Sequence, residues 1–534
     1  MIITTKKISI SLLSIILLTC LGFLLGKYSR SEKPEKSVVQ SEVTAPKLVE
    51  RPWGKLGTEN SKKKSLFVDE EATKLGAIRG QRTLQFSSRE AMDDFLRRAS
   101  GKIRIMDRID GLNALRIGFD DSNLLTGLLD GTEQMGMIYP AYTPDPTGGG
   151  TVQANAVPLG RNLPAWLGLD AFDPALGKGI KIAILDTGVV PHPAYGDVKN
   201  YILTQAPENF ADWNGHGTAA ASLIIGNSST VPGAAPGAEL TSWRVASDDG
   251  VSDSWTIAKA IYEAVDAGNQ IISLSMGSYG DSKVLYDAVQ YASTNGAVIV
   301  ASSGNDGRTQ AAYPANYSGV IASTAVDAQN NHLLFSNHAT NENGLSAPGW
   351  KVASAWPNNQ VAQFSGTSAS APIISGTLAA VMSHHNVTAV QAYNIMLNYA
   401  NETGTLGYDP QTGAGAPNLG RVFNSTVPNI SDSAVASQVI TPPTKDSPAS
   451  VQVNIQNQGT VALTNVPVTI ATPSGQYTRI VQTLAPNQVK SFDIPLSNAP
   501  FEQGQTVSIT TSISTADHQA ANNQRTTSWL PVDP

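Results

Sequence analysis

Three side chains with the chemistry needed for catalysis by a serine nucleophile occur in this sequence, each within two residues of a glycine. In chain order they are Asp186, His216 and Ser368. A serine hydroxyl is a weak nucleophile by itself, so it needs an imidazole as base and a carboxylate that orients the imidazole and stabilises its cation. Neighbouring glycines allow tight turns and close approach of a substrate backbone. The set predicts attack by serine on an acyl group.

A fourth side chain, the amide of Asn305, could complete this chemistry. It lies in a Gly-Asn-Asp-Gly stretch directly after an apolar run at residues 297–301, and an amide near the serine could stabilise the oxyanion of a tetrahedral intermediate. Ser368 opens an apolar helical pattern that runs to about Met382. Pro372 is compatible with that helix because it falls in the first turn. The N–H groups at such a helix end favour a developing negative charge.

The elements that must position these side chains are strands and helices in alternation. Unbroken apolar runs, typical of parallel strands covered on both faces, lie at residues 180–185, 271–274, 297–301 and 320–326. Helical patterns lie between them at residues 218–225, 256–267 and 285–295. The order predicts an α/β fold with a doubly wound, mostly parallel sheet. In such folds, loops at the carboxyl ends of the strands build the active site.

At this point the residues resemble the subtilisin-like serine peptidases. The three signatures are Asp-Thr-Gly at 186–188, His-Gly-Thr at 216–218 and Gly-Thr-Ser-Ala-Ser-Ala-Pro at 366–372, in the chain order Asp, His, Ser that this family shows. The Gly-Asn-Asp-Gly stretch at 304–307 resembles the family's oxyanion-asparagine loop. The resemblance covers about residues 155–424, within a catalytic domain that we expect at residues 146–424.

The resemblance implies a serine endopeptidase that hydrolyses peptide bonds through an acyl-enzyme. His216 would take the proton of Ser368, and Asp186 would orient His216. The amide of Asn305 and the backbone N–H of Ser368 would bind the oxyanion. No cofactor is required for this chemistry. Structural calcium is common in the family, but no ligand set can be matched here residue by residue, so no metal site is assigned.

Protein or peptide substrates are the implied partners of two further stretches. Ser275 and Gly277 would lie on an edge with which the substrate pairs as an added strand. Ser302 and Gly304 would line the main side-chain pocket. Because both stretches are uncharged, we expect an apolar or aromatic side chain before the scissile bond.

A compact α+β pattern precedes the catalytic domain. Residues 79–145 show the order β-α-β-β-α-β of a small ferredoxin-like unit, with its last strand at 134–139. The unit resembles the family's inhibitory pro-segment, so residues 79–142 are expected to bind the catalytic domain, inhibit it and aid its folding. Cleavage of this zymogen is expected between Tyr142 and Pro158. The alternative is a permanent domain without an inhibitory role.

The N-terminus indicates export. Lys6 and Lys7 precede an uncharged run at residues 8–25, so residues 1–28 are predicted to be a signal peptide or a signal anchor, with lipid attachment at Cys20 as a third alternative. Residues 29–78 are polar and are predicted to be a linker. We therefore expect an extracytoplasmic protein, either anchored in the cell envelope, with a possible membrane anchor, or secreted.

Charge and cysteine content exclude several other classes. The formal net charge is −7 over 534 residues, and the acidic excess lies after residue 150. A nucleic-acid-binding domain would be strongly basic, so nucleic acid is not an expected partner. Cys20 is the only cysteine, which excludes an intramolecular disulfide.

We expect the protein to be a monomer.

The C-terminal segment shows a different pattern. Residues 425–448 are rich in Ser, Thr and Pro and are predicted to be a linker. Residues 449–534 contain stretches of period two and resemble an Ig-like β-sandwich, which would bind a partner or act as a spacer. This module raises an alternative function: a catalytically inactive envelope adhesion or scaffold protein built on a peptidase fold.

Overall fold

The computed structural model describes residues 70–143, 152–515 and 517–530. Its central feature is a sheet of seven strands, all paired in parallel. In spatial order these are β13 (Gly344–Pro348), β12 (Val320–Val326), β11 (Val298–Ser302), β10 (Ile271–Leu274), β6 (Lys181–Asp186), β8 (Glu239–Arg244) and β7 (Lys199–Ile202). The predicted α/β fold with a mostly parallel sheet is confirmed.

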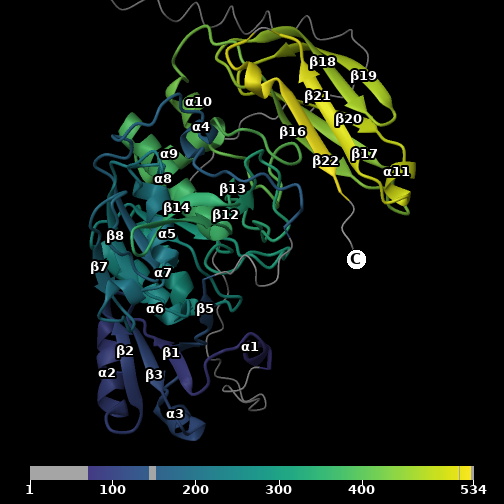
Figure 1. Cartoon of the computed structure of the whole chain (residues 1–534). Coiled ribbons are helices and arrows are strands. Elements are labelled where there is room, and N and C mark those ends of the chain that lie inside the picture. Colours follow the sequence, from purple (N-terminus) through teal and green to yellow (C-terminus); the bar gives the residue numbers. More distant parts are fainter. Residues whose placement is uncertain (1–69, 144–151, 516, 531–534) are drawn as a thin grey trace, which may run out of the picture. The chain divides into compact units, whose positions relative to one another are not determined.

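Helices cover the two faces of this sheet and create two separate cores (Figure 1). Ile182 and Ile184 pack in one core with α5 (His216–Ile225) and α8 (Thr367–His385). Ala183 and Leu185 pack in the other with α6 (Ser254–Asp266) and α7 (Lys283–Thr294). Because successive strand residues face opposite sides, burial on both faces requires the unbroken apolar runs seen in the sequence.

Three strands of the sheet, β7, β8 and β13, were not predicted. Their sequences mix polar and apolar residues, as in Glu-Leu-Thr-Ser-Trp-Arg of β8. Arg244 at the end of β8 is nevertheless fully buried, because its guanidinium pairs with Asp248 at 2.8 Å and donates to the carbonyl of Gln205 at 3.1 Å. A buried charge with such partners is tolerated, but the local sequence does not predict which residues will be the partners of Arg244.

The segment before this body forms a four-stranded antiparallel sheet in the order β2-β3-β1-β4. Its elements are β1 (Gln81–Gln85), α2 (Arg89–Ala99), β2 (Arg104–Ile109), β3 (Ala114–Gly118), α3 (Ser122–Leu128) and β4 (Gln134–Gly136). Ser88 caps α2 by accepting the Ala91 N–H at 3.2 Å. The last predicted strand, 134–139, is shorter than expected, since the chain leaves this sheet after Gly136.

After β4 the chain pairs with the catalytic body instead. Residues Pro140–Tyr142 form β5, which is antiparallel to β9 (Val251–Asp253). Beyond β5, the expected cleavage region and the boundary at 145/146 fall partly in residues 144–151, outside the described ranges. The segment 1–28 lies outside them too, and of the predicted 29–78 linker only residues 70–78 are described, including α1 (Glu70–Lys74).

The C-terminal region consists of two antiparallel sheets, consistent with a β-sandwich. One contains β16 (Ser433–Thr441), β17 (Ser450–Asn457) and β20 (Val489–Pro495). The other contains β19 (Gly475–Leu484), β18 (Leu463–Thr472), β21 (Val507–Ile513) and β22 (Gln524–Trp529). Within the described residues, no helix is long and apolar enough to cross a membrane.

One prediction fails here, because β16 lies inside residues 425–448, which were expected to be a linker. The polar residues Ser433, Ser437 and Gln438 of this strand are buried. Gln438 donates to the carbonyl of Arg525 at 3.0 Å and accepts from the Thr511 hydroxyl at 2.8 Å. Such polar residues satisfy a buried strand only when other strands supply the complementary groups.

A buried carboxyl group lies in the loop between α9 (Ala389–Asn398) and α10 (Leu419–Phe423). Glu402 is 8% exposed, and its two oxygens accept the backbone N–H groups of Thr403 at 3.1 Å and Gly407 at 2.9 Å. Burial outweighs these hydrogen bonds and raises the pKa of Glu402 to about 8.

This raised pKa predicts that stability falls as the pH rises. Between pH 4.5, the usual glutamate pKa, and pH 8, the folded protein keeps a proton that the unfolded chain releases, so deprotonation favours unfolding. Over pH 5–8, we expect Tm to fall by a few degrees more in wild type than in Glu402→Gln. Scanning calorimetry would measure this, with Glu239→Gln, at an exposed site, as control. Parallel curves for wild type and Glu402→Gln would contradict it.

Candidate active site

Asp186 and His216 are joined by a hydrogen bond at the carboxyl edge of the parallel sheet. Asp186 ends β6, His216 begins α5, and Nδ1 of His216 lies 2.8 Å from Oδ1 of Asp186. The same carboxylate oxygen accepts the Thr187 N–H at 2.7 Å. A Cβ at Gly217 would lie 2.3 Å from the carbonyl oxygen of Gly188. Position 217 therefore requires glycine. The hydrogen bond to Asp186 holds the imidazole of His216 in one orientation.

Ser368 reaches the same edge from α8. The register pairs Leu185 with Leu274, so the next residues, Asp186 and Ser275, lie at neighbouring strand ends. Ser275 donates from its hydroxyl to the carbonyl of Ser368 at 3.0 Å, and the Ser368 hydroxyl donates to the carbonyl of Ser275 at 3.5 Å. The three predicted triad residues thus gather around the carboxyl ends of β6 and β10.

The imidazole has one nitrogen left for proton transfer. Nε2 of His216 is buried and has no hydrogen-bond partner within the described ranges. The ring lies edge-on to Phe364, with centroids 5.0 Å apart, at the end of β15 (Gln360–Phe364) that leads into α8. The Ser368 hydroxyl is directed at Ser275 and not at Nε2. Catalytic hydrogen bonds are often long before substrate binds, so this geometry is compatible with a serine–histidine pair.

Asn305 follows β11 and is oriented by the first residue of α8. Its Oδ1 accepts both the N–H of Thr367 at 2.9 Å and the hydroxyl of Thr367 at 2.8 Å. The amide nitrogen consequently lies on the side of Gly366, where an added Cβ would be 2.6 Å from Nδ2. Gly366 has a φ of +109°, a conformation that only glycine adopts readily. The amide donor therefore lies beside the chain that enters α8 just before Ser368.

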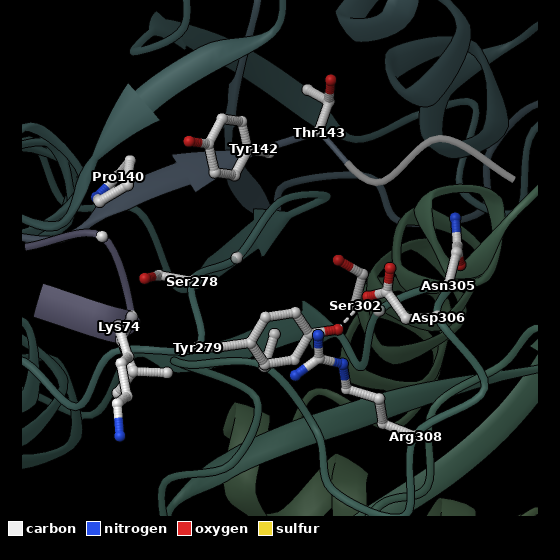
Figure 2. Close-up of a pocket in the computed structure, with 15 residues that line it drawn as sticks. Lys74, Pro140, Tyr142, Thr143, Ser278, Tyr279, Ser302, Asn305, Asp306 and Arg308 are labelled. Atoms are coloured by element: carbon white, nitrogen blue, oxygen red, sulfur yellow. Dashed lines mark hydrogen bonds between the residues drawn. The ribbon is translucent and has the colours of Figure 1, made fainter. Parts of the chain in front are cut away.

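A cavity of about 630 Å³ is lined by Asn305 but by none of Asp186, His216 and Ser368 (Figure 2). Of the four predicted substrate-binding residues, Gly277, Ser302 and Gly304 line it, whereas Ser275 does not. The chain's own Tyr142 lines it too, and pairs with Gly277 through two backbone hydrogen bonds of 3.0 and 3.1 Å. The edge predicted to bind a substrate strand is thus occupied by the end of the preceding segment.

Sequence reasoning missed one wall of this cavity. Figure 2 shows Tyr279, Asp306 and Arg308 together on that wall. The Tyr279 hydroxyl donates to Asp306, and the Arg308 guanidinium lies 3.8 Å from the centre of the tyrosine ring. Burial, followed by the hydrogen bond to Asp306, raises the pKa of Tyr279. The uncharged stretches 275–277 and 301–304 gave no sign of these charges, although Asp306 and Arg308 follow Asn305 by one and three residues in the sequence.

Across residues 70–143, 152–515 and 517–530, no group of three or more His, Cys, Asp or Glu side chains could hold a metal ion.

Known proteins resemble the middle of the chain. Residues 177–415 match the model of the subtilase family. Subtilisin BL of Lederbergia lenta is 35% identical over 232 residues, which is 43% of this chain and 86% of that protein. The thermostable alkaline protease of Halalkalibacterium halodurans is 35% identical over 248 residues, 46% of this chain and 68% of that one. Among solved structures, the prenylagaramide maturation protease PagA is 27% identical with a TM-score of 0.43, covering 49% of this chain and 97% of that one.

Gly366 offers a test of the geometry around Asn305. In Gly366→Ala, the new Cβ would collide with the Asn305 amide, so we expect kcat for peptide hydrolysis to fall by about 10-fold or more, with a smaller change in KM. Gly296→Ala is the matched control, because Gly296 also has a positive φ of +77° but no atom within 4 Å of the added Cβ. An unchanged kcat in Gly366→Ala would contradict the assigned geometry.

Proposed function

Because this chain belongs to the subtilase family and is a subtilisin-like serine endopeptidase, we propose that Ser368, His216 and Asp186 are its catalytic triad. The observation that carries the proposal is the His216–Asp186 hydrogen bond of 2.8 Å, which leaves a buried Nε2 without a partner in the described structure. Such a nitrogen, held by a carboxylate on the far side of the ring, is suited to accept a proton from a serine hydroxyl.

The reaction proceeds in two displacements. Nε2 of His216 takes the proton of Ser368 while Oγ forms a bond to the substrate carbonyl carbon, and the carbonyl oxygen becomes an oxyanion. The amide of Asn305 and the N–H of Ser368 donate to that oxygen. The C–N bond then breaks, and His216 returns the proton to the leaving amine. A water attacks the acyl-enzyme by the same route, with His216 as its base. Protein side chains and backbone supply every group, so no cofactor enters the chemistry.

Substrate binding is proposed to use the edge that Tyr142 now occupies. Gly277 would exchange its two backbone hydrogen bonds with Tyr142 for the same pair with a substrate strand. Ser302 and Gly304 would contact the side chain before the scissile bond, next to the wall that carries Asp306 and Arg308.

Replacing the nucleophile tests the triad. Ser368→Ala is expected to lose at least about 10⁴-fold in kcat and all labelling by a fluorophosphonate probe, a magnitude established for this family. Ser370→Ala, a buried serine in the same helix whose hydroxyl bonds to the Ala347 carbonyl, should keep both. Absence of labelling in the processed wild-type protein would favour the inactive adhesion or scaffold protein instead.

We also propose that residues 79–142 act as an inhibitory pro-segment. Besides the Tyr142–Gly277 pairing, Asp107 of β2 accepts hydrogen bonds from Lys259 at 2.8 Å and Trp255 at 3.0 Å, both on α6. Burial alone would raise the pKa of Asp107, but the hydrogen bonds from Lys259 and Trp255 outweigh it and hold that pKa below its usual value. These contacts favour tight association in the ionised state.

Inhibition in trans tests this role. Residues 79–142 added to the processed enzyme should inhibit it, and the Asp107→Ala segment should do so about 10-fold more weakly. Asp120→Ala is the control, because the side chain of Asp120 is 94% exposed and has no contact with α6 among the described ion pairs. No inhibition by the wild-type segment would leave a permanent structural domain as the better description.

Export completes the proposal. The basic and apolar pattern of residues 1–28 supports a signal peptide or anchor, and one relative, 34% identical over 243 residues, is the minor extracellular protease Epr of Bacillus subtilis. We therefore place the activity outside the cytoplasm, in a monomer that is anchored in the cell envelope or secreted.

A further inference from the structure

Asn337 is a fully buried amide to which no role has yet been given. It lies between β12 and β13, more than 30 residues from Asn305 in the chain. All four of its side-chain hydrogen bonds reach other loops at the active site. Oδ1 accepts the N–H groups of Asp306 at 3.1 Å and Arg308 at 2.8 Å, and Nδ2 donates to the Ser303 carbonyl at 3.0 Å and the Tyr279 hydroxyl at 2.7 Å.

The backbone of Asn337 adds contacts to the same loop. Its N–H donates to the carbonyl of Gly304 at 2.9 Å, and its carbonyl accepts the hydroxyl of Ser303 at 2.9 Å. The amide also lies close to Gly304, where an added Cβ would be 2.2 Å from Nδ2. Residues on both sides of Asn305 are therefore bound to one side chain.

These hydrogen bonds hold a loop that has no regular secondary structure. Residues 303–308 lie outside any helix or strand, so separate hydrogen bonds to Thr367, Ser323, Phe335 and Asn337 hold the loop. An oxyanion donor is effective only when it is held in place before the charge develops. A displacement of about 1 Å can lower the catalytic rate by about 100-fold.

We propose that Asn337 is a positioning residue, which holds the 303–308 loop so that the Asn305 amide stays where the oxyanion forms. The inference rests on the proposed oxyanion role of Asn305 and extends it. The 303–308 loop also carries Asp306 and Arg308 of the cavity wall, and the same amide connects it to Tyr279, the third residue of that wall (Figure 2). Asn337 thus contacts both the loop that carries Asn305 and the cavity wall formed by Tyr279, Asp306 and Arg308.

A double-mutant cycle tests the proposal in the processed full-length enzyme. Asn305→Ala alone should lower kcat by about 10²–10³-fold, the magnitude known for this donor in the family. Asn337→Ala should lower kcat by about 10-fold or more with a smaller change in KM. In the Asn305→Ala background, the same change should cost less than about 3-fold, because no donor remains to be positioned.

A second readout separates positioning from general destabilisation. A peptide aldehyde forms a tetrahedral adduct with the serine, so its affinity should fall in Asn337→Ala in parallel with kcat, while KM changes less. If Asn337→Ala fails to fold, Asn337→Asp keeps the size and both accepted bonds, removes both donated bonds and should show the same non-additivity.

Asn341 is the matched control. It is an amide in the same connection between β12 and β13, and it donates to the carbonyls of Ala315, Tyr317 and Val320 at 2.7, 2.9 and 2.9 Å, with none of these partners in the 303–308 loop. Asn341→Ala should lower Tm but change kcat equally in both backgrounds.

Additive effects of Asn337→Ala and Asn305→Ala would overturn the inference. So would an unchanged kcat in Asn305→Ala alone, because that removes the oxyanion role on which the inference rests. In either case, loss of activity in Ser368→Ala would still support Ser368 as the nucleophile. Failure of the Asn337 inference can therefore be distinguished from failure of the proposed peptidase mechanism.

Discussion

The parallel register of β6, β10 and β11 is the constraint on which the active site depends. Parallel strands end at one edge, so residues that follow them in the chain become neighbours although about 90 residues separate Asp186 from Ser275. Helices on both faces bury every residue of these three strands except Lys181. As a result, the polar groups after each strand meet in a place where water is scarce and each hydrogen bond has a large effect.

Residues at the N-terminal end of α8 form hydrogen bonds with the residues that follow β10 and β11. Thr367 orients Asn305, Ser368 exchanges hydrogen bonds with Ser275, and Gly366 leaves room for the amide. Asn337 then holds the loop that carries Asn305 from the opposite side. The site is therefore a set of polar groups that fix one another, a condition under which buried polar networks are rigid rather than costly.

In our proposals, the edge at Gly277 serves both inhibition and catalysis. Backbone pairing at Gly277 is independent of side-chain identity, so the edge accepts Tyr142 of the same chain and, in our proposal, a substrate strand. Side-chain contacts such as that of Asp107 with Lys259 distinguish the preceding segment from a substrate strand, because only the preceding segment makes them. Competition for a shared edge needs no conformational switch in the catalytic domain.

The sequence by itself determined the strands β6, β10, β11 and β12 and the candidates Asp186, His216, Ser368 and Asn305, because unbroken apolar runs and glycine-flanked motifs are local signals. Their catalytic roles stay proposals. Only the tertiary structure decided that residues 433–441 form a strand, that Arg308 and Tyr279 line the substrate cavity, and that Asn337 brackets the oxyanion loop. Each of these depends on partners far away in the chain. A buried polar residue has no periodic signature, since its burial is favourable only when the fold brings the complementary donor or acceptor to it.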